Sequence, residues 1–184
     1  MNANLVEHQS RSSQGVLLRG ERAVQQAFRQ GLRALRSHID SGGPAAELSW
    51  EGLETLQRRW HGRVDLQLVA LAPLAFWTSA EAESMARRLV TCGGVLGGVL
   101  DPSMLGPVVA EQLKALLHLA DRHGLAVDLH IDEADKAPAQ GVEQLLRALQ
   151  ITPVTVPITC SHASSLALLP PIALQRLGER MMTA

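Results

Sequence analysis

The sequence contains no tyrosine, and only two phenylalanines and three tryptophans among its 184 residues. This scarcity of aromatic rings disfavours a surface on which nucleotide bases could stack. The formal net charge of −1 gives no attraction to a phosphate backbone either, so we expect no nucleic-acid partner. The two cysteines, Cys92 and Cys160, form neither a C-x-x-C pair nor a disulfide framework, which predicts a reducing, cytoplasmic setting.

Long hydrophobic runs are missing as well. Glycine, proline or a charged residue interrupts every apolar run well before the roughly 20 residues that a membrane span needs. Residues 1–20 hold no apolar segment typical of a signal peptide, so we expect no membrane partner. Neither a G-x-G-x-x-G fingerprint nor a P-loop occurs, and a nucleotide-binding Rossmann domain therefore has little support.

The remaining composition, 46% hydrophobic and 19% charged, is typical of a globular domain. Apolar residues at intervals of three and four predict helices at 21–35, 49–60, 79–92, 106–124, 140–150 and 169–182. Short apolar runs predict strands at 35–40, 64–71, 93–100, 125–131 and 153–160. This alternation predicts an α/β fold of parallel strands with crossover helices. We expect an N-terminal tail over 1–20 and one domain over 21–184.

Local signals suggest where some of these helices begin and end. Ser49 and Ser79 are candidate N-caps, and Gly124 is a candidate C-terminal stop. Pro170 and Pro171 would occupy the first turn of the last helix, where proline is tolerated.

Polar residues gather where four of the predicted strands end. They are Ser37, His38 and Asp40; Asp101; His130, Asp132 and Glu133; and Cys160, Ser161 and His162. In parallel α/β sheets and barrels this rim is where ligands bind. The convergence of ionisable and metal-binding groups on one rim favours a functional site more than any single residue does.

Each of these residues also has an ordinary structural interpretation. His130 could be a solvated histidine at a strand end, and His162 could cap the segment that follows it. Asp132 and Glu133 could be acids favoured by a helix N-terminus.

The sequence context of two further acids and of the two cysteines indicates structural roles more clearly. Asp40 and Asp101 are typical turn formers, since SGGP and PS follow them. Cys92 and Cys160 are typical of small buried apolar groups.

The functional interpretation of the rim is metal-assisted hydrolysis. Imidazoles and carboxylates hold divalent metals, which lower the pKa of bound water. A nearby carboxylate can then accept a proton and pass it to a leaving group. His130 would supply a ligand and Glu133 a proton shuttle, while His162 would orient or hold the water.

These residues resemble a known family. DLHIDE followed by TCSHASS is similar to the cytosine deaminase branch of the amidohydrolase superfamily, whose members are metal-dependent (β/α)8 barrels. GLRALRSHID and VDLQLVALAP resemble the second and third strands of that family, and GGVLGGVLDPSM lies where the fourth is expected. The resemblance covers about residues 21–182 and implies a partial TIM-type barrel of about five parallel strands, equivalent to strands two to six.

The resemblance also implies roles and partners. His130 would bind one divalent metal, zinc or iron, Glu133 would be the catalytic proton shuttle, and His162 would contact the reacting water or the metal. His38 and Asp40 match a motif of the family whose role is structural rather than catalytic. The implied substrate is a small heterocycle or cyclic amide, and the implied reaction is hydrolysis of a C–N bond other than a peptide bond.

The sequence departs from the family at several positions. The H-x-H pair of the family's first strand occurs nowhere, and the aspartate of its eighth strand has no counterpart. The ring-binding glutamine expected after the third strand is also absent, because the sequence there reads ALAPLAFW. A complete barrel of this type needs about 250 residues. We therefore expect an incomplete metal site in this chain alone.

These departures keep a second function open. The chain could be a truncated or degenerate domain without catalysis that acts as a binding or assembly module. An open piece of barrel would expose strand edges and an apolar interior, which predicts a homo-oligomer or a partner that covers them. A phosphate-binding barrel piece is disfavoured, since Asp101 in LGGVLDPS would repel phosphate.

Overall fold

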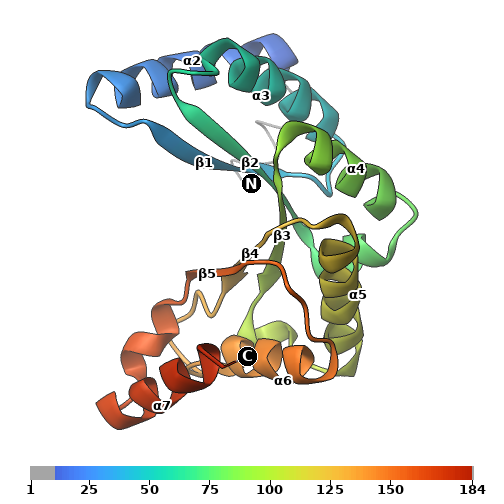
Figure 1. The fold of residues 1–184 in the computed structure, drawn as a ribbon, viewed down its shortest axis with the longest axis vertical. Helices are drawn as coiled ribbons and strands as arrows, with labels where there is room; N and C mark the ends of the chain where they lie inside the picture. Colours follow the sequence, from blue (N-terminus) through green and yellow to red (C-terminus); the bar gives the residue numbers. More distant parts are fainter. Residues whose placement is uncertain (1–10, 184) are drawn as a thin grey trace, which may run out of the picture.

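The computed structural model describes residues 11–183 as a five-stranded parallel sheet with helices between the strands (Figure 1). The strands lie side by side in chain order. They are β1 (Ala34–Asp40), β2 (Asp65–Pro73), β3 (Val95–Leu100), β4 (Val127–Ile131) and β5 (Ile158–His162). The helices are α2 (Ser13–Arg29), α3 (Ala46–Trp60), α4 (Ala82–Cys92), α5 (Pro107–His123), α6 (Gln140–Ile151) and α7 (Pro171–Met181). The short 3-10 turns are η1 (Leu74–Thr78), η2 (Pro102–Met104) and η3 (Ser164–Leu168).

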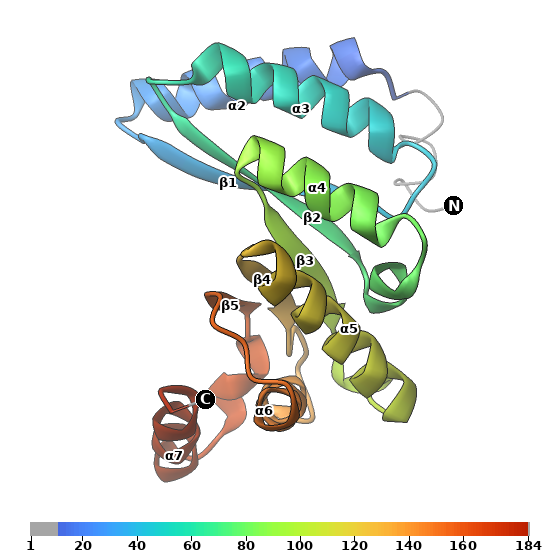
Figure 2. The same ribbon diagram turned by 45° about the vertical axis from the view of Figure 1, so that its right-hand side comes forward.

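The sheet curls, its helices lie along the outer side, and its inner side faces an opening (Figure 1, Figure 2). Helices α2 and α3 lie at the β1 end of the sheet, and α6 and α7 lie at the β5 end (Figure 2). Every neighbouring pair of strands is parallel, so all carboxyl ends meet at one rim. The prediction of a partial TIM-type barrel with crossover helices is confirmed. Among residues 11–183, no helix has the length and apolar character that crossing a membrane requires.

The first described helix begins earlier than the sequence pattern predicted. Helix α2 starts at Ser13, not at residue 21, because the Ser12 hydroxyl accepts a hydrogen bond from the Gly15 amide and caps it. The expected tail over 1–20 is therefore helical in most of its described part, while residues 1–10 lie outside that part. A Cβ at Gly52 of α3 would lie 2.7 Å from the Ser13 carbonyl oxygen, so this glycine permits α2 and α3 to pack closely.

The local signals for helix ends were right at two places and wrong at two others. Gly124 ends α5 in the left-handed conformation, and Pro171 opens α7, as expected. Ser49 is not an N-cap: it lies inside α3, where its hydroxyl donates to the Ala45 carbonyl. Ser79 is not one either, since Glu81 occupies the N-cap of α4.

The last strand lies later in the chain than predicted. Its expected range was 153–160, but β5 spans Ile158–His162. Proline has no amide hydrogen to donate to a ladder, so the strand begins just after Pro157. The carbonyl of Pro157 still accepts a hydrogen bond from Val127. This shift brings His162 into the strand itself.

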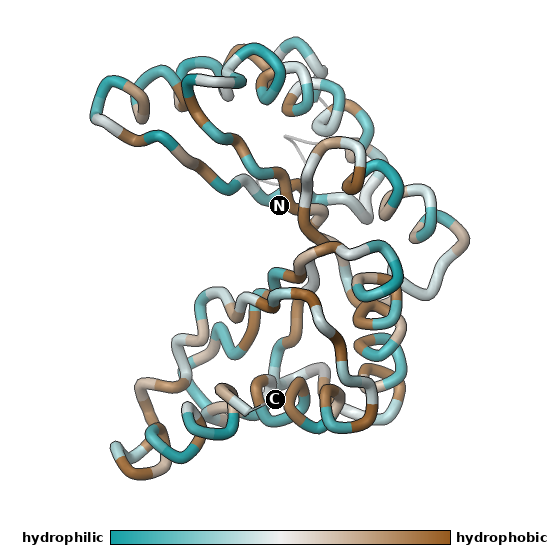
Figure 3. The backbone as a smooth tube through the Cα atoms, viewed as in Figure 1, coloured by the Kyte–Doolittle hydropathy of each residue, from teal (hydrophilic) through white to brown (hydrophobic). Residues whose placement is uncertain are grey.

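The two faces of the sheet differ in character. Outer-face leucines such as Leu96 and Leu129 are fully buried beneath the helices, and hydrophobic residues recur along the central strands (Figure 3). Ladder partners share a face, as do alternate residues along a strand. By this rule the inner face carries Arg36, His38, Asp40, Gln67, Val69, Leu71, Val95, Gly97, Val99, Asp128, His130, Thr159 and Ser161. The interior is apolar only in part: β2 and β3 carry mostly apolar side chains on this face, whereas β1, β4 and β5 carry mostly polar ones.

Candidate active site

One histidine ring contacts two others on the inner face. His130, on β4, is the central one: its ring centroid lies 4.6 Å from that of His38 on β1 and 4.4 Å from that of His162 on β5. Because β1 is three places from β4 in the sheet, only the curl of the sheet brings these two rings together. The rim of the half-barrel therefore gathers imidazoles from strands that are far apart in the sequence.

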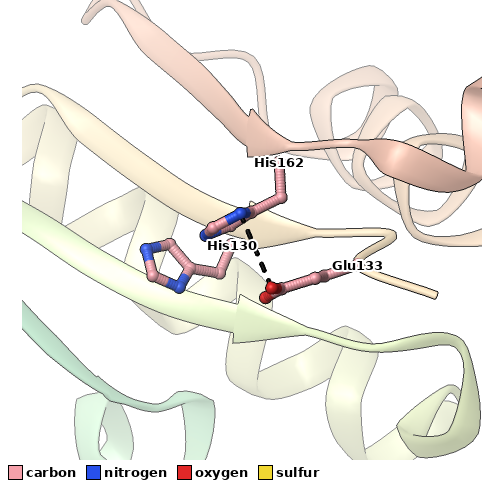
Figure 4. Close-up of side chains that lie close together, drawn as sticks. All are labelled: His130, Glu133 and His162. Atoms are coloured by element: carbon pink, nitrogen blue, oxygen red, sulfur yellow. Dashed lines mark ion pairs between the residues drawn. The ribbon is translucent and has the colours of Figure 1, made fainter.

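Glu133 completes a compact cluster with two of these rings. Its carboxylate oxygen lies 3.6 Å from Nδ1 of His162 (Figure 4). One potential ligand atom from each of His130, Glu133 and His162 lies within 4.8 Å of the other two. The structure thus brings together all the residues for which the sequence predicted catalytic or metal-binding roles, and the roles themselves remain predictions.

The direction of the His162 side chain depends on an irregular backbone. Its ladder partner Ile131 points into the buried outer core. A regular strand would aim His162 the same way. Instead His162 and the following Ala163 are left-handed, with φ of 67° and 46°. The strand breaks at this point, and the ring packs against His130 on the inner face.

A buried carboxylate below the histidines escaped the sequence analysis. Asp128 has a side-chain exposure of 1%, and it accepts hydrogen bonds from Arg36 at 2.6 Å and from the Ser161 hydroxyl at 2.5 Å. Nε2 of His38 lies 3.4 Å from the same carboxylate. A signal was available, because a charged residue within an apolar strand requires a buried partner.

The pKa values of these groups follow from their surroundings. Burial lowers the pKa of His130, and the neighbouring rings of His38 and His162 lower it further. Burial would raise the pKa of Asp128, but the hydrogen bonds from Ser161 and Arg36 outweigh that effect and hold it below its usual value. His130 is therefore a neutral imidazole and Asp128 a carboxylate near neutral pH.

The other acids of the rim have structural surroundings. Asp132 is fully buried, and its carboxylate accepts from the amides of Gly141 and Val142 at the start of α6. Glu133 is not in the first turn of α6, which begins at Gln140. Asp101 accepts from the Ser103 amide and caps η2, which agrees with its interpretation as a turn former.

An apolar pocket of about 450 Å³ opens near the carboxyl ends of β1, β2 and β3. Its walls include Leu71, Leu74 and Val99, and its polar groups come from Asp40 and Gln112. Val99 is the ladder partner of His130, so the pocket adjoins the strand that carries the cluster. Pockets of this size hold small organic molecules.

The donor set of the cluster fits a divalent zinc or iron ion. Imidazole nitrogens and carboxylate oxygens are ligands for both metals, and a low histidine pKa favours the neutral form that binds. Structural zinc sites use four ligands, whereas catalytic sites use three and leave one position open. Residues 130, 133 and 162 offer three such donors, and the expectation of an incomplete metal site in this chain alone stays a prediction.

Two curated proteins are similar to this chain. The chain is 31% identical over 160 residues to the pterin deaminase of Rhizobium rhizogenes, covering 85% of this chain and 35% of that protein. It is 25% identical over 128 residues to the N-isopropylammelide isopropyl amidohydrolase of Pseudomonas sp., covering 70% and 32%. The chain spans about a third of the length of these relatives. No protein-family model matches it.

Solved structures share the fold. The 5-methylcytosine deaminase of Klebsiella pneumoniae, liganded with 5-fluorocytosine, superimposes with a TM-score of 0.77 at 20% identity over 96% of this chain and 43% of that one. The N-isopropylammelide isopropylaminohydrolase of Burkholderia multivorans gives 0.70 at 22% identity over 90% and 41%. With its curled sheet and its curated relatives, the chain is a deaminase-like partial domain of the amidohydrolase superfamily.

Proposed function

We propose that the chain contributes to a metal-dependent hydrolase that cleaves a C–N bond, other than a peptide bond, in a small heterocycle or cyclic amide. The observation that carries this proposal is the cluster of His130, Glu133 and His162, whose donor atoms lie within 4.8 Å of one another at the rim. The curated relatives support the reaction class, since they are a pterin deaminase and an ammelide amidohydrolase.

We assign each residue of the cluster one role. His130 holds the metal, because burial keeps its ring neutral. Zinc or iron, when bound, lowers the pKa of water towards neutrality. Glu133 is exposed enough to reach both solvent and substrate, so its carboxylate accepts the proton of the attacking water and delivers it to the ring nitrogen or the leaving amine. His162 contacts the metal or its water through the imidazole.

The substrate binds in the apolar pocket beside β3. Its walls exclude water from one face of a planar ring, and Asp40 and Gln112 offer a carboxylate and an amide for the ring's polar edge. The stretch ALAPLAFW lacks the ring-binding glutamine that the resemblance led us to expect, so recognition of the ring rests on other groups. This arrangement selects small rings with polar edges.

The experiment that tests the proposal measures ammonia or amine release from cytosine, pterin and N-isopropylammelide, with zinc or iron supplied. Replacing the shuttle in Glu133→Gln should lower the rate about 100- to 10,000-fold, which is the usual contribution of a general base. The control is Asp135→Asn, which removes an exposed carboxylate two residues further along. Equal rates in the two variants would contradict the assigned role.

A domain that binds without catalysis is the second candidate. It is favoured by the absence of an H-x-H pair from the sequence, since that pair would bring two further imidazoles. Calorimetry with the same three heterocycles separates the two functions. Binding without product under either metal would favour the binding module, whereas turnover would exclude it.

We further propose a cytoplasmic setting and a covering partner. Both cysteines are free thiols, as a reducing compartment requires. Strands β1 and β5 are the outer strands of the sheet, and each has one edge unpaired by the other four. A second copy or another polypeptide would cover these edges, because open strand edges promote association.

A further inference from the structure

Asp132 connects the end of β4 to the start of α6. It lies between two cluster residues in the sequence and is fully buried. Its Oδ1 accepts from the Gly141 amide at 2.8 Å, and its Oδ2 accepts from the Val142 amide at 2.9 Å. Both carboxylate oxygens thus accept hydrogen bonds from the first turn of α6.

The backbone of the same residue connects β4 to the segment after β5. The Asp132 carbonyl accepts from the Ser165 amide at 3.0 Å and from the Ser164 hydroxyl at 3.3 Å. Ser165 in turn accepts from the Ala139 amide just before α6. The Ala163 amide donates to the Ile131 carbonyl, one residue before Asp132. The ends of β4, β5 and the loop into α6 therefore meet at Asp132.

These hydrogen bonds hold a strained stretch of backbone. Asp132, His162 and Ala163 are all left-handed without being glycine, with φ of 52°, 67° and 46°. Such conformations persist only where surrounding contacts impose them. The left-handed turn at His162 is what directs its ring to His130, so the contacts that impose it also set the cluster.

Gly141 leaves the space that the Asp132 carboxylate occupies. A Cβ at Gly141 would lie 3.0 Å from Oδ1 of Asp132 and 2.9 Å from the Leu100 carbonyl oxygen. Backbone atoms cannot yield easily, so a larger residue would displace α6 from this contact. The lack of a side chain at Gly141 thus allows the start of α6 to lie close to the Asp132 carboxylate.

We propose that Asp132 is the positioning residue of the cluster: it fixes the places of His130, Glu133 and His162 through the backbone and contacts neither metal nor substrate. The effect of Asp132 on metal affinity rests on the proposed function, whereas its effect on the placement of the two imidazole rings does not. The tested substitutions are Asp132→Ala, Asp132→Asn and Gly141→Ala. The matched control is Asp101→Ala, which removes an aspartate that caps η2 at the end of a different strand.

The first measurement is the nuclear Overhauser effect between the ring protons of His130 and His162, taken without metal. It should be present in the wild type and in Asp101→Ala, be lost in Asp132→Ala and Gly141→Ala, and be weakened in Asp132→Asn. Asp132→Asn retains one side-chain oxygen that can accept a hydrogen bond from the first turn of α6. It therefore serves as the test if the alanine variants do not fold. An unchanged effect in Asp132→Asn and in any folded alanine variant would overturn the proposal.

The second measurement is zinc affinity. Loss of Asp132 should weaken binding about 10- to 100-fold, the usual range for residues that orient ligands. The Asp101→Ala control should bind as the wild type does. Equal affinities in Asp132→Ala and the wild type would overturn the proposal. A wild type that binds no zinc but retains the ring-to-ring effect would instead contradict the proposed function and leave the positioning role standing on the first measurement.

Discussion

At the scale of single residues, the inner face depends on a charge whose partners the sequence pattern did not reveal. Asp128 is buried on β4, and its partners Arg36 and Ser161 are 92 and 33 residues away. Such partners become neighbours only once the sheet has curled. His130 and Glu133, by contrast, could be predicted, because their place at a strand end is a local property of the sequence.

Neutralising this carboxylate should destabilise the fold. Asp128→Asn removes the charge that Arg36 and His38 face, and we expect a loss of about 1–3 kcal/mol in the free energy of unfolding. Arg36 is partly exposed, so solvent limits the loss. Urea denaturation should show a lower midpoint at an unchanged slope. The control Asp65→Asn changes an exposed aspartate of β2, and equal midpoints for the two variants would refute the expectation.

At the scale of elements, the periodic pattern identified the helices and strands better than their ends. The repeat of apolar residues is strong within α5 and α6, and both were predicted within a residue or two. The start of α2 and the place of β5 were missed, since they depend on the Ser12 cap and on Pro157. Ends are set by single side chains, and these carry less signal than a repeat.

Helix α7 offers a test of how one element is held. Arg180 on α7 donates two hydrogen bonds to the Glu143 carboxylate of α6, at 2.6 and 2.9 Å, and this lowers the pKa of Glu143. Because this pKa is lower in the folded chain than in the unfolded chain, the ionised carboxylate stabilises the fold at pH values above the ordinary glutamate pKa. This stabilisation is lost as the pH falls through the lower pKa of the folded chain. Glu143→Gln should therefore be slightly less stable than the wild type at pH 7.

The difference in stability between the wild type and Glu143→Gln should vanish at low pH. Because the ordinary glutamate pKa is about 4.3, the gap should begin to close below that value and disappear once the wild-type carboxyl is protonated. Thermal unfolding of both proteins between pH 7 and pH 2 measures it. A gap that stays constant over this range would show that the pair does not hold α7.

At the scale of the whole molecule, the curl of the sheet makes the site. The sequence predicted five parallel strands and a rim with ionisable ends, and both are present in the described residues. It could not predict the contact of His38 with His130, or the turn that brings His162 inward, because both depend on tertiary geometry. The apolar interior expected from the sequence is found mainly on β2 and β3, since the register decides which side chains face inward.

The most direct test of the central claim is a zinc titration of the metal-free chain by calorimetry, alongside the variants His130→Ala and His162→Ala. The control is His118→Ala, which changes an exposed histidine of α5 away from the cluster. The account predicts one zinc ion per wild-type and per control chain, and no measurable binding in the two cluster variants. Equal binding in all four proteins, or no binding in the wild type, would contradict a metal centre at His130 and His162.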